Sequence, residues 1–335
     1  MSGISRVRAW WAQRPPAAGA AVMATGIVSV GLQQVEAETL SRVALVLACV
    51  AWAGLAADFV VRLLADRRRW LTEARKPSAL TAVAATSVLG TRFSLLGRQP
   101  LAEALLALAT LLWPPLLVLV VRHWKKRMPG SVFLGCVATE GLTVLGATLA
   151  AALGTAWLAH LALVLFWLGL ALYGLAVPHF ACRQVVSGPG DQWVAGGALA
   201  ISALAGAKLL AADSARLYLW NDDDQGVLRT VTVALLALAL AWYVVLLAAE
   251  LARPRLRYDE RRWATVFPMG MTAAAVLSVA TSAGVTWLTW PGRVLVWIAA
   301  AAWLAVAAGA AVTARAAFGK ASWEGSRRVT STARR

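Results

Sequence analysis

Two ionisable side chains lie inside long apolar stretches of this chain. Glu140 is about nine residues into the stretch 131–153, and Lys208 is near the end of the stretch 192–212. Charge is costly at such positions, so the side chains face protein or water and are candidates for function. Lys208 would attract anions, and Glu140 would titrate or tune selectivity. The structural alternatives are that Lys208 reaches the interface to pair with Asp213, and that Glu140 is a protonated or hydrogen-bonded packing residue.

The sequence has no pattern typical of catalysis or metal binding. His123 and His179 lie at the ends of apolar stretches and His160 lies in another stretch, so the three lack the spacing of metal ligands. The GxSxG, HExxH and P-loop motifs are absent. An intramembrane enzyme would need facing Asp, His or Ser groups on separate helices, which these stretches hardly offer. We therefore expect neither enzymatic activity nor a cofactor.

The elements that position these residues are predicted to be membrane-spanning helices. A span needs roughly 20 mostly apolar residues, and a chain that is 60% hydrophobic and 14% charged is not a soluble domain. Ten spans are predicted, at 18–35, 40–64, 78–96, 101–121, 131–153, 157–180, 192–212, 227–250, 264–285 and 292–316. The fold class is therefore an all-α polytopic membrane protein. A transmembrane domain at 18–316 is flanked by a basic N-terminal segment, 1–17, and a basic tail, 317–335.

The segments between the spans alternate between strongly basic and nearly uncharged, which predicts an orientation. Most Lys and Arg residues lie on the side that holds both termini, as in the run from Arg67 to Lys76. The positive-inside rule makes this side, with both termini, cytoplasmic, and we expect the protein in the cell (inner) membrane. The same loops, together with anionic lipid, explain the formal net charge of +16 without nucleic acid. The first stretch follows arginines, as a secretory signal does, but its small and hydroxylated interior favours a span.

The odd-numbered spans differ in composition from the even-numbered ones. Odd spans are rich in Gly, Ala, Ser and Thr, whereas even spans carry Leu, Val and mid-membrane tryptophans such as Trp113 and Trp242. Small residues allow close packing and line wet paths, and Leu and Trp suit lipid. We expect five tandem hairpins, with the odd helices inside around a pore; a compact bundle without a pore is the alternative. The predicted pore-lining residues are Glu140, Lys208, Thr25, Ser29, Thr139, Thr143, Ser202 and Thr272.

Five segments, in order along the chain, are similar to the tellurite-resistance/dicarboxylate transporter family of the voltage-dependent anion channel superfamily. They are VMATGIVSVGL, LATLLWPPLLVLVVRHW, VATEGLTVLGA, DQWVAGGALAISALAGA and WATVFPMGMTAAA. This family includes bacterial tellurite-resistance permeases, the yeast malate permease, fungal sulfite pumps and plant slow anion channels. The resemblance implies five tandem hairpins around a pore, commonly in homotrimers. It also implies a small anionic substrate: a C4-dicarboxylate such as malate, sulfite, tellurite or an inorganic anion.

The resemblance also implies a role for Phe267, because channel members of the family have a pore-blocking Phe in the ninth helix. A Phe ring on an inner helix bent by Pro268 can occlude a narrow passage; the alternative is that Phe267 only packs against a neighbouring helix. Glu140 departs from the bacterial relatives, which have a neutral amide there. Since a mid-pore carboxylate opposes anion passage, a proton-coupled anion exporter with Glu140 as the titrating group is one alternative. A non-transporting membrane scaffold is another.

Overall fold

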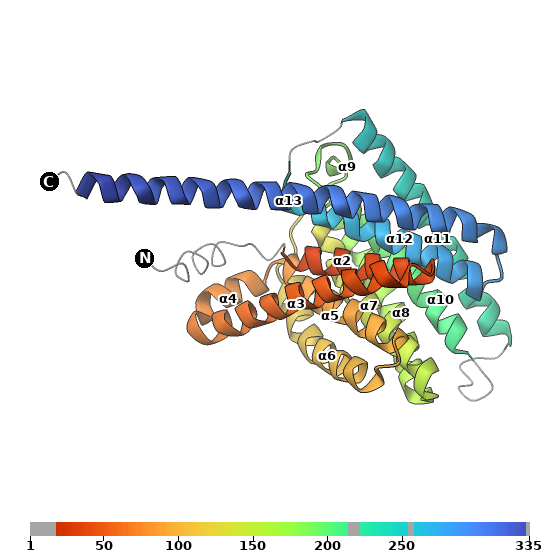
Figure 1. The fold of residues 1–335 in the computed structure, drawn as a ribbon. Coiled ribbons are helices and arrows are strands. Elements are labelled where there is room, and N and C mark those ends of the chain that lie inside the picture. Colours follow the sequence, from red (N-terminus) through yellow and green to blue (C-terminus); the bar gives the residue numbers. More distant parts are fainter. Residues whose placement is uncertain (1–17, 214–221, 254–257, 333–335) are drawn as a thin grey trace.

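The computed structural model describes residues 18–213, 222–253 and 258–332, so the predicted N-terminal segment 1–17 lies outside the described residues. A helix occupies each of the ten apolar stretches (Figure 1). The ten helices are α2 (Ala18–Gln34), α3 (Glu38–Ala65), α5 (Thr81–Leu95), α6 (Gln99–Val121), α7 (Leu134–Leu153), α8 (Ala156–Ala176), α10 (Trp193–Ala212), α11 (Asp222–Ala252), α12 (Trp263–Ser282) and α13 (Thr289–Thr332).

Eight of these helices are long and apolar enough to cross a membrane. The other two, α2 with 17 residues and α5 with 15, are shorter than a full span. A 3-10 turn, η1 (Pro77–Leu80), continues directly into α5 and lengthens it. Among the described residues, the only pairing of β type is an isolated bridge between Met128 and Phe180. The chain is therefore an almost entirely helical, multi-pass membrane protein.

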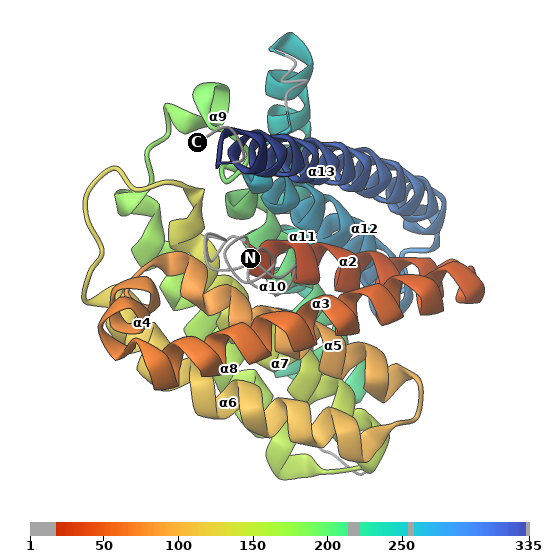
Figure 2. The ribbon, with the colours of Figure 1, turned by 60° about the vertical axis from the view of Figure 1, so that its left-hand side comes forward.

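Five helices pack side by side in a closed ring. Helix α2 contacts α5, α5 contacts α7, α7 contacts α10, α10 contacts α12, and α12 contacts α2. Each ring helix also packs against the helix that follows it, namely α3, α6, α8, α11 or α13. The ring helices are enclosed by these partners: 94% of the apolar window of α7 is buried, compared with 17% for α3. We call the ring helices inner and their partners outer (Figures 1 and 2).

Glycines allow the inner helices to approach one another closely. A Cβ atom built on Gly26 of α2 would lie 2.8 Å from a side-chain carbon of Val88 on α5. A Cβ atom on Gly197 of α10 would lie equally close, at 2.8 Å, to the ring of Pro268 on α12. Such distances are shorter than a side-chain contact permits, so only glycine fits there. Small residues in the inner helices therefore serve the packing of the ring.

The connections from inner to outer helices repeat one backbone feature. A residue with positive φ follows α2, α5, α7 and α12: Glu36 (65°), Gly97 (73°), Gly154 (66°) and Gly284 (69°). A left-handed residue at this position ends a helix and turns the chain back sharply, and glycine adopts that conformation without strain. Glu36 does so without that advantage. The corresponding connection after α10 lies outside the described residues.

Several elements were not predicted. A short helix, α4 (Arg67–Ala74), forms in the most basic loop, and α9 (Gln184–Ser187) precedes α10. Further 3-10 turns are η2 (Gly130–Phe133), η3 (Val177–His179), η4 (Glu260–Arg262) and η5 (Thr286–Leu288). Helix α13 does not end near residue 316 but continues to Thr332, and it projects beyond the other helices at the end of the molecule where α4 lies (Figure 1).

Candidate functional site: a vestibule at one end of the helix ring

A cavity of about 410 Å³ lies at the end of the ring where the inner helices begin. All five inner helices contribute residues from their first turns or close to them: Ala20 and Met23, Thr81, Leu134, Val194, and Ala264 and Phe267. We call this cavity the vestibule. The 3-10 turns η1, η2 and η4 lead into three of these helices and place Ser78, Ser131 and Arg261 in its wall.

The electrostatics of the vestibule favour an anion. The inner helices all begin here, so the positive ends of five helix dipoles point toward one cavity. Among the described residues, two cations, Lys76 and Arg261, also line it, against a single carboxylate, Asp191. Sequence reasoning treated Lys76 and Arg261 only as markers of topology. One signal in the sequence could have identified them: each lies just before the start of an inner helix, Lys76 before α5 and Arg261 before α12.

Phe267 and Met23 form the inner end of the vestibule. Among the lining residues they lie farthest along their helices, and each is only 1% exposed. The ring of Pro268, the next residue, packs against Gly197 of α10, which fixes this part of α12 against its neighbour. A proline inside a helix also frees the carbonyl one turn earlier, here that of Ala264 in the vestibule wall. The inner end of the cavity is therefore lined by two apolar side chains.

Asp191 is the acidic residue of the vestibule. Its Oδ1 atom is buried and has no hydrogen-bond partner among the described residues. Burial raises the pKa of Asp191 above its ordinary value; the positive charge of Arg261 opposes this shift and the negative charge of Asp259 adds to it. A carboxyl in this position can hold a proton or a hydrogen-bond donor.

Comparison with known families decides the class of protein that carries this ring and vestibule. Residues 13–311 match the family described as voltage-dependent anion channel, SLAC1. The chain belongs to this family. Its members are channels or transporters, so the predictions of family, of anion transport across a membrane and of a non-enzymatic protein are confirmed. A comparison with individual curated proteins gives no match.

In this member of the anion channel family, two of the hydroxyls predicted to line the pore face the outer helices instead. Thr139 accepts a hydrogen bond from the indole nitrogen of Trp113 on α6 at 2.9 Å. Thr25 accepts one from Trp303 on α13 at the same distance, 2.9 Å. These tryptophans, which composition assigned to lipid, are therefore partly enclosed and hydrogen-bonded. Each hydroxyl also donates to a carbonyl of its own helix, so neither has a free donor for an anion.

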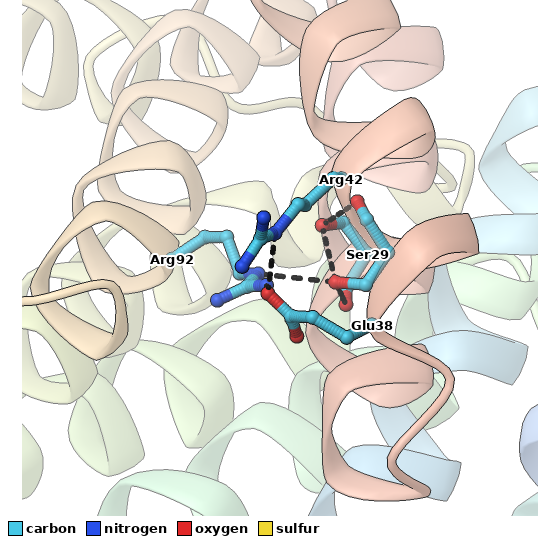
Figure 3. Close-up of polar contacts among 5 residues, drawn as sticks. Ser29, Glu38, Arg42 and Arg92 are labelled. Atoms are coloured by element: carbon cyan, nitrogen blue, oxygen red, sulfur yellow. Dashed lines mark hydrogen bonds and ion pairs between the residues drawn. The ribbon is translucent and has the colours of Figure 1, made fainter.

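Ser29 belongs to a polar network at the opposite end of the ring from the vestibule (Figure 3). Its hydroxyl donates to the carbonyl of Ser41 on α3 at 2.7 Å. The guanidinium of Arg92, only 1% exposed, donates to the Ser41 hydroxyl at 3.2 Å and to the Glu38 carboxylate at 3.0 Å. Glu38 also pairs with Arg42 at 3.0 Å. The sequence analysis did not single out Arg92, although it lies inside the stretch 78–96.

The remaining predicted hydroxyls are bonded within their own helices. Thr143, Ser202 and Thr272 each donate to the carbonyl four residues earlier, at 3.3, 2.9 and 2.9 Å. Ser202 also lies 3.8 Å from the sulfur of Cys136, which joins α10 to α7. None of the three lines the vestibule.

Glu140 points away from the vestibule, toward an outer helix. It is 0% exposed, and neither carboxyl oxygen has a hydrogen-bond partner among the described residues. A Cβ atom built on Gly169 of α8 would lie 2.5 Å from its Oε1 atom, so the carboxyl packs directly against that glycine. The predicted carboxylate therefore lies where α7, α8 and α10 meet.

Lys208 lies near the end of α10 that is remote from the vestibule and is partly buried. In the part of the chain that the structure describes, it makes no ion pair, whereas Asp213 accepts a hydrogen bond from Gln225 at 3.1 Å. Within the same described residues, no group of His, Cys, Asp and Glu side chains is arranged to hold a metal ion.

Proposed function

We propose that this protein moves small anions along the axis of the inner ring, with Phe267 as the constriction. In this proposal all ten long helices cross the membrane as five tandem hairpins. The substrate is a C4-dicarboxylate such as malate, sulfite, tellurite or an inorganic anion, as in the family that the chain resembles. Lys208 acts on the anion beyond the constriction.

One observation supports this proposal above all: a vestibule with two cations and five helix N-termini has the apolar side chains of Phe267 and Met23 at its inner end. Such a cavity concentrates anions at its mouth and excludes water at its inner end. An apolar constriction gates by dewetting, because an ion cannot pass without water or a substitute for its hydration shell. Family membership supports transport over the scaffold alternative.

The basic loops give the proposed orientation. The vestibule shares its end of the molecule with α4 and with the cationic segments around Arg261, so the positive-inside rule places it in the cytoplasm together with both termini. The membrane in this proposal is the cell (inner) membrane. Assembly as a homotrimer is proposed from the family resemblance alone.

Anion flux into liposomes tests the constriction. Phe267→Ala removes the ring and lets water reach the axis, so we expect flux at least tenfold above that of the natural protein, the size of a barrier lowered by about 1.4 kcal/mol. The measurement is the initial rate of anion uptake by purified, monodisperse protein. Equal or lower flux from folded protein would assign Phe267 to packing.

Phe166 provides the matched control. It is a fully buried phenylalanine on the outer helix α8, away from the vestibule. Truncation of a core phenylalanine costs about 3–5 kcal/mol of stability wherever it occurs. Phe166→Ala should therefore destabilise the protein without raising flux. A rise in both variants would mean that loosened packing, not an opened constriction, causes the leak.

A second candidate function, a proton-coupled anion exporter, is favoured by the surroundings of Glu140. A buried carboxyl without hydrogen-bond partners is least costly when it is neutral, so its ionisation would disturb the packing of three helices. Binding or release of the proton would then change how α7, α8 and α10 pack together. It would not add or remove a charge along the path of the anion. An imposed pH gradient should drive anion flux in an exporter and leave the flux of a channel unchanged.

A further inference from the structure

Asp191 is a residue that an anion path does not require. It lines the same cavity as Lys76 and Arg261, with one buried carboxyl oxygen that no described residue satisfies. A negative charge in this place repels every anion that enters the vestibule. Removal of this charge would speed the entry of all anions. A carboxylate in the vestibule is therefore explained only if it favours some anions over others.

The backbone around Asp191 is held in place by close packing. Gly130, at the start of η2, lies so close to the carbonyl of Asp191 that a Cβ atom there would overlap it. The N–H of Gly190 donates to the side-chain oxygen of Gln192 at 2.9 Å, which closes the turn before α10. Asp191 thus lines the cavity from a fixed backbone.

The segments around Asp191 contribute charged groups of both signs. Arg261 and Asp259 approach from the segment before α12, and Lys76 lines the cavity from the segment before η1. Among the described lining residues, η2, α7 and α9 contribute no charged group to the vestibule. The three charged lining residues leave one net positive charge when all are ionised, so a monoanion is still attracted.

An ionised carboxylate distinguishes anions by whether they carry a hydrogen-bond donor. Chloride and nitrate have none and meet only repulsion from Asp191. A hydrogen-oxyanion or a half-protonated dicarboxylic acid has an O–H group that donates to the carboxylate, and such charge-assisted bonds are the strong ones. A hydrogen bond to a charged group corresponds to about ten- to a hundredfold in binding.

We propose that Asp191 makes the vestibule selective for anions that carry their own O–H donor, with Lys76 and Arg261 holding the negative end of the same anion. This inference rests on the proposed function and deepens it. The substrate class becomes hydrogen-oxyanions and carboxylate monoanions with a free acid group, in preference to halides and nitrate.

The test compares four monoanions in liposomes: chloride, nitrate, hydrogensulfite and the monoanion of malonic acid. Asp191→Asn keeps the shape of the side chain and removes its charge. We expect the ratio of flux with an O–H group to flux without one to fall about tenfold or more, mainly through faster chloride and nitrate flux. Asp191→Glu, which retains a carboxylate, should preserve the selectivity. Asp191→Ser supplies a second neutral variant should the amide fail to fold.

Glu260→Gln is the matched control, because Glu260 is an exposed carboxylate in η4 that does not line the vestibule. It removes the same charge from the same end of the molecule and should leave the flux ratio unchanged. An equal rise of all four fluxes in Asp191→Asn would show that Asp191 only repels, and an unchanged ratio would overturn the inference as well. If the natural protein moved none of the four anions, the proposed function itself would fail.

Discussion

Two equivalent helix contacts of the ring, between α6 and α7 and between α8 and α10, are filled by different side chains. By a joint we mean the place where the outer helix of one pair meets the inner helix of the next. At the first, the Trp113 indole donates to Thr139 at 2.9 Å. At the second, α8 has Gly169, and the space is taken by the carboxyl of Glu140 from α7.

The first arrangement recurs at two further joints of the ring. Trp52 of α3 donates to Thr86 of α5 at 2.9 Å, and Trp303 of α13 donates to Thr25 of α2. At these joints a polar group buried in the membrane domain has a partner, whereas both oxygens of Glu140 have none among the described residues. At these three joints the hydrogen bond therefore joins two neutral groups. The joint at Glu140 instead buries a carboxyl, and we expect its energy to depend on whether that carboxyl is protonated.

The largest effect is expected from Gly169→Ala. The new methyl group would collide with the Glu140 carboxyl, and because that carboxyl is fully buried we expect a loss of about 1–3 kcal/mol, as for other overpacked cores. Thermal unfolding of detergent-solubilised protein measures it. Gly174→Ala on the same helix is the control, since no atom lies within 4 Å of a Cβ atom there.

A double-mutant cycle assigns that loss to the contact. In a Glu140→Ala background, Gly169→Ala should cost much less, because the two sites are in contact and their effects are not additive. Equal costs in both backgrounds would mean that the methyl group meets something other than Glu140. The comparison of joints would then lose its central contact.

A smaller effect is expected at a tryptophan joint. Trp113→Phe removes the N–H that bonds to Thr139, and hydrogen bonds between membrane helices contribute about 0.6 kcal/mol on average. Trp167→Phe on α8 is the control: Trp167 is 45% exposed, and its substitution should shift the apparent melting temperature less than Trp113→Phe does. Equal shifts of the melting temperature would show that the loss of side-chain volume matters rather than the loss of the hydrogen bond to Thr139.

Much of the fold follows from the sequence because span length and charge alternation are one-dimensional signals. The ten helical stretches agree with the predicted spans to within a few residues at most boundaries, and the exceptions are informative. Helix α13 continues past 316 because Ala, Arg and Lys prolong a helix beyond the apolar stretch. Composition distinguished the helices that are buried from those that are exposed, since small residues are needed wherever helices pack in a ring.

The orientation of individual side chains did not follow from the sequence. The hydroxyls of Thr25 and Thr139 lie on inner helices, as expected, but their neighbours on the outer helices decide where they point. The vestibule was missed because its residues come from five segments far apart in the chain. No spacing in a single sequence relates Asp191 to Lys76.

The sharpest test of the comparison is Glu140→Gln, for which only a small change in stability is expected. If the carboxyl at this joint is neutral, an amide of the same shape should alter stability by less than about 1 kcal/mol. It would also remove the carboxyl that, in the coupled-exporter alternative, binds the proton at this joint. Any pH dependence of anion flux that arises at this joint should therefore disappear while transport is kept.

Asp191 would contribute a pH dependence of its own. Burial raises its pKa, so as the pH falls it is protonated earlier than an exposed Asp, the negative charge leaves the vestibule, and chloride flux rises. The Glu140→Gln experiment is therefore made in an Asp191→Asn background, where only Glu140 remains to be tested. Chloride flux in that background should rise as the pH falls when Glu140 is present and stay flat when Gln replaces it. If both proteins gave the same pH profile, Glu140 would be a packing residue like the tryptophans at the other joints, and the channel would be favoured over the coupled exporter.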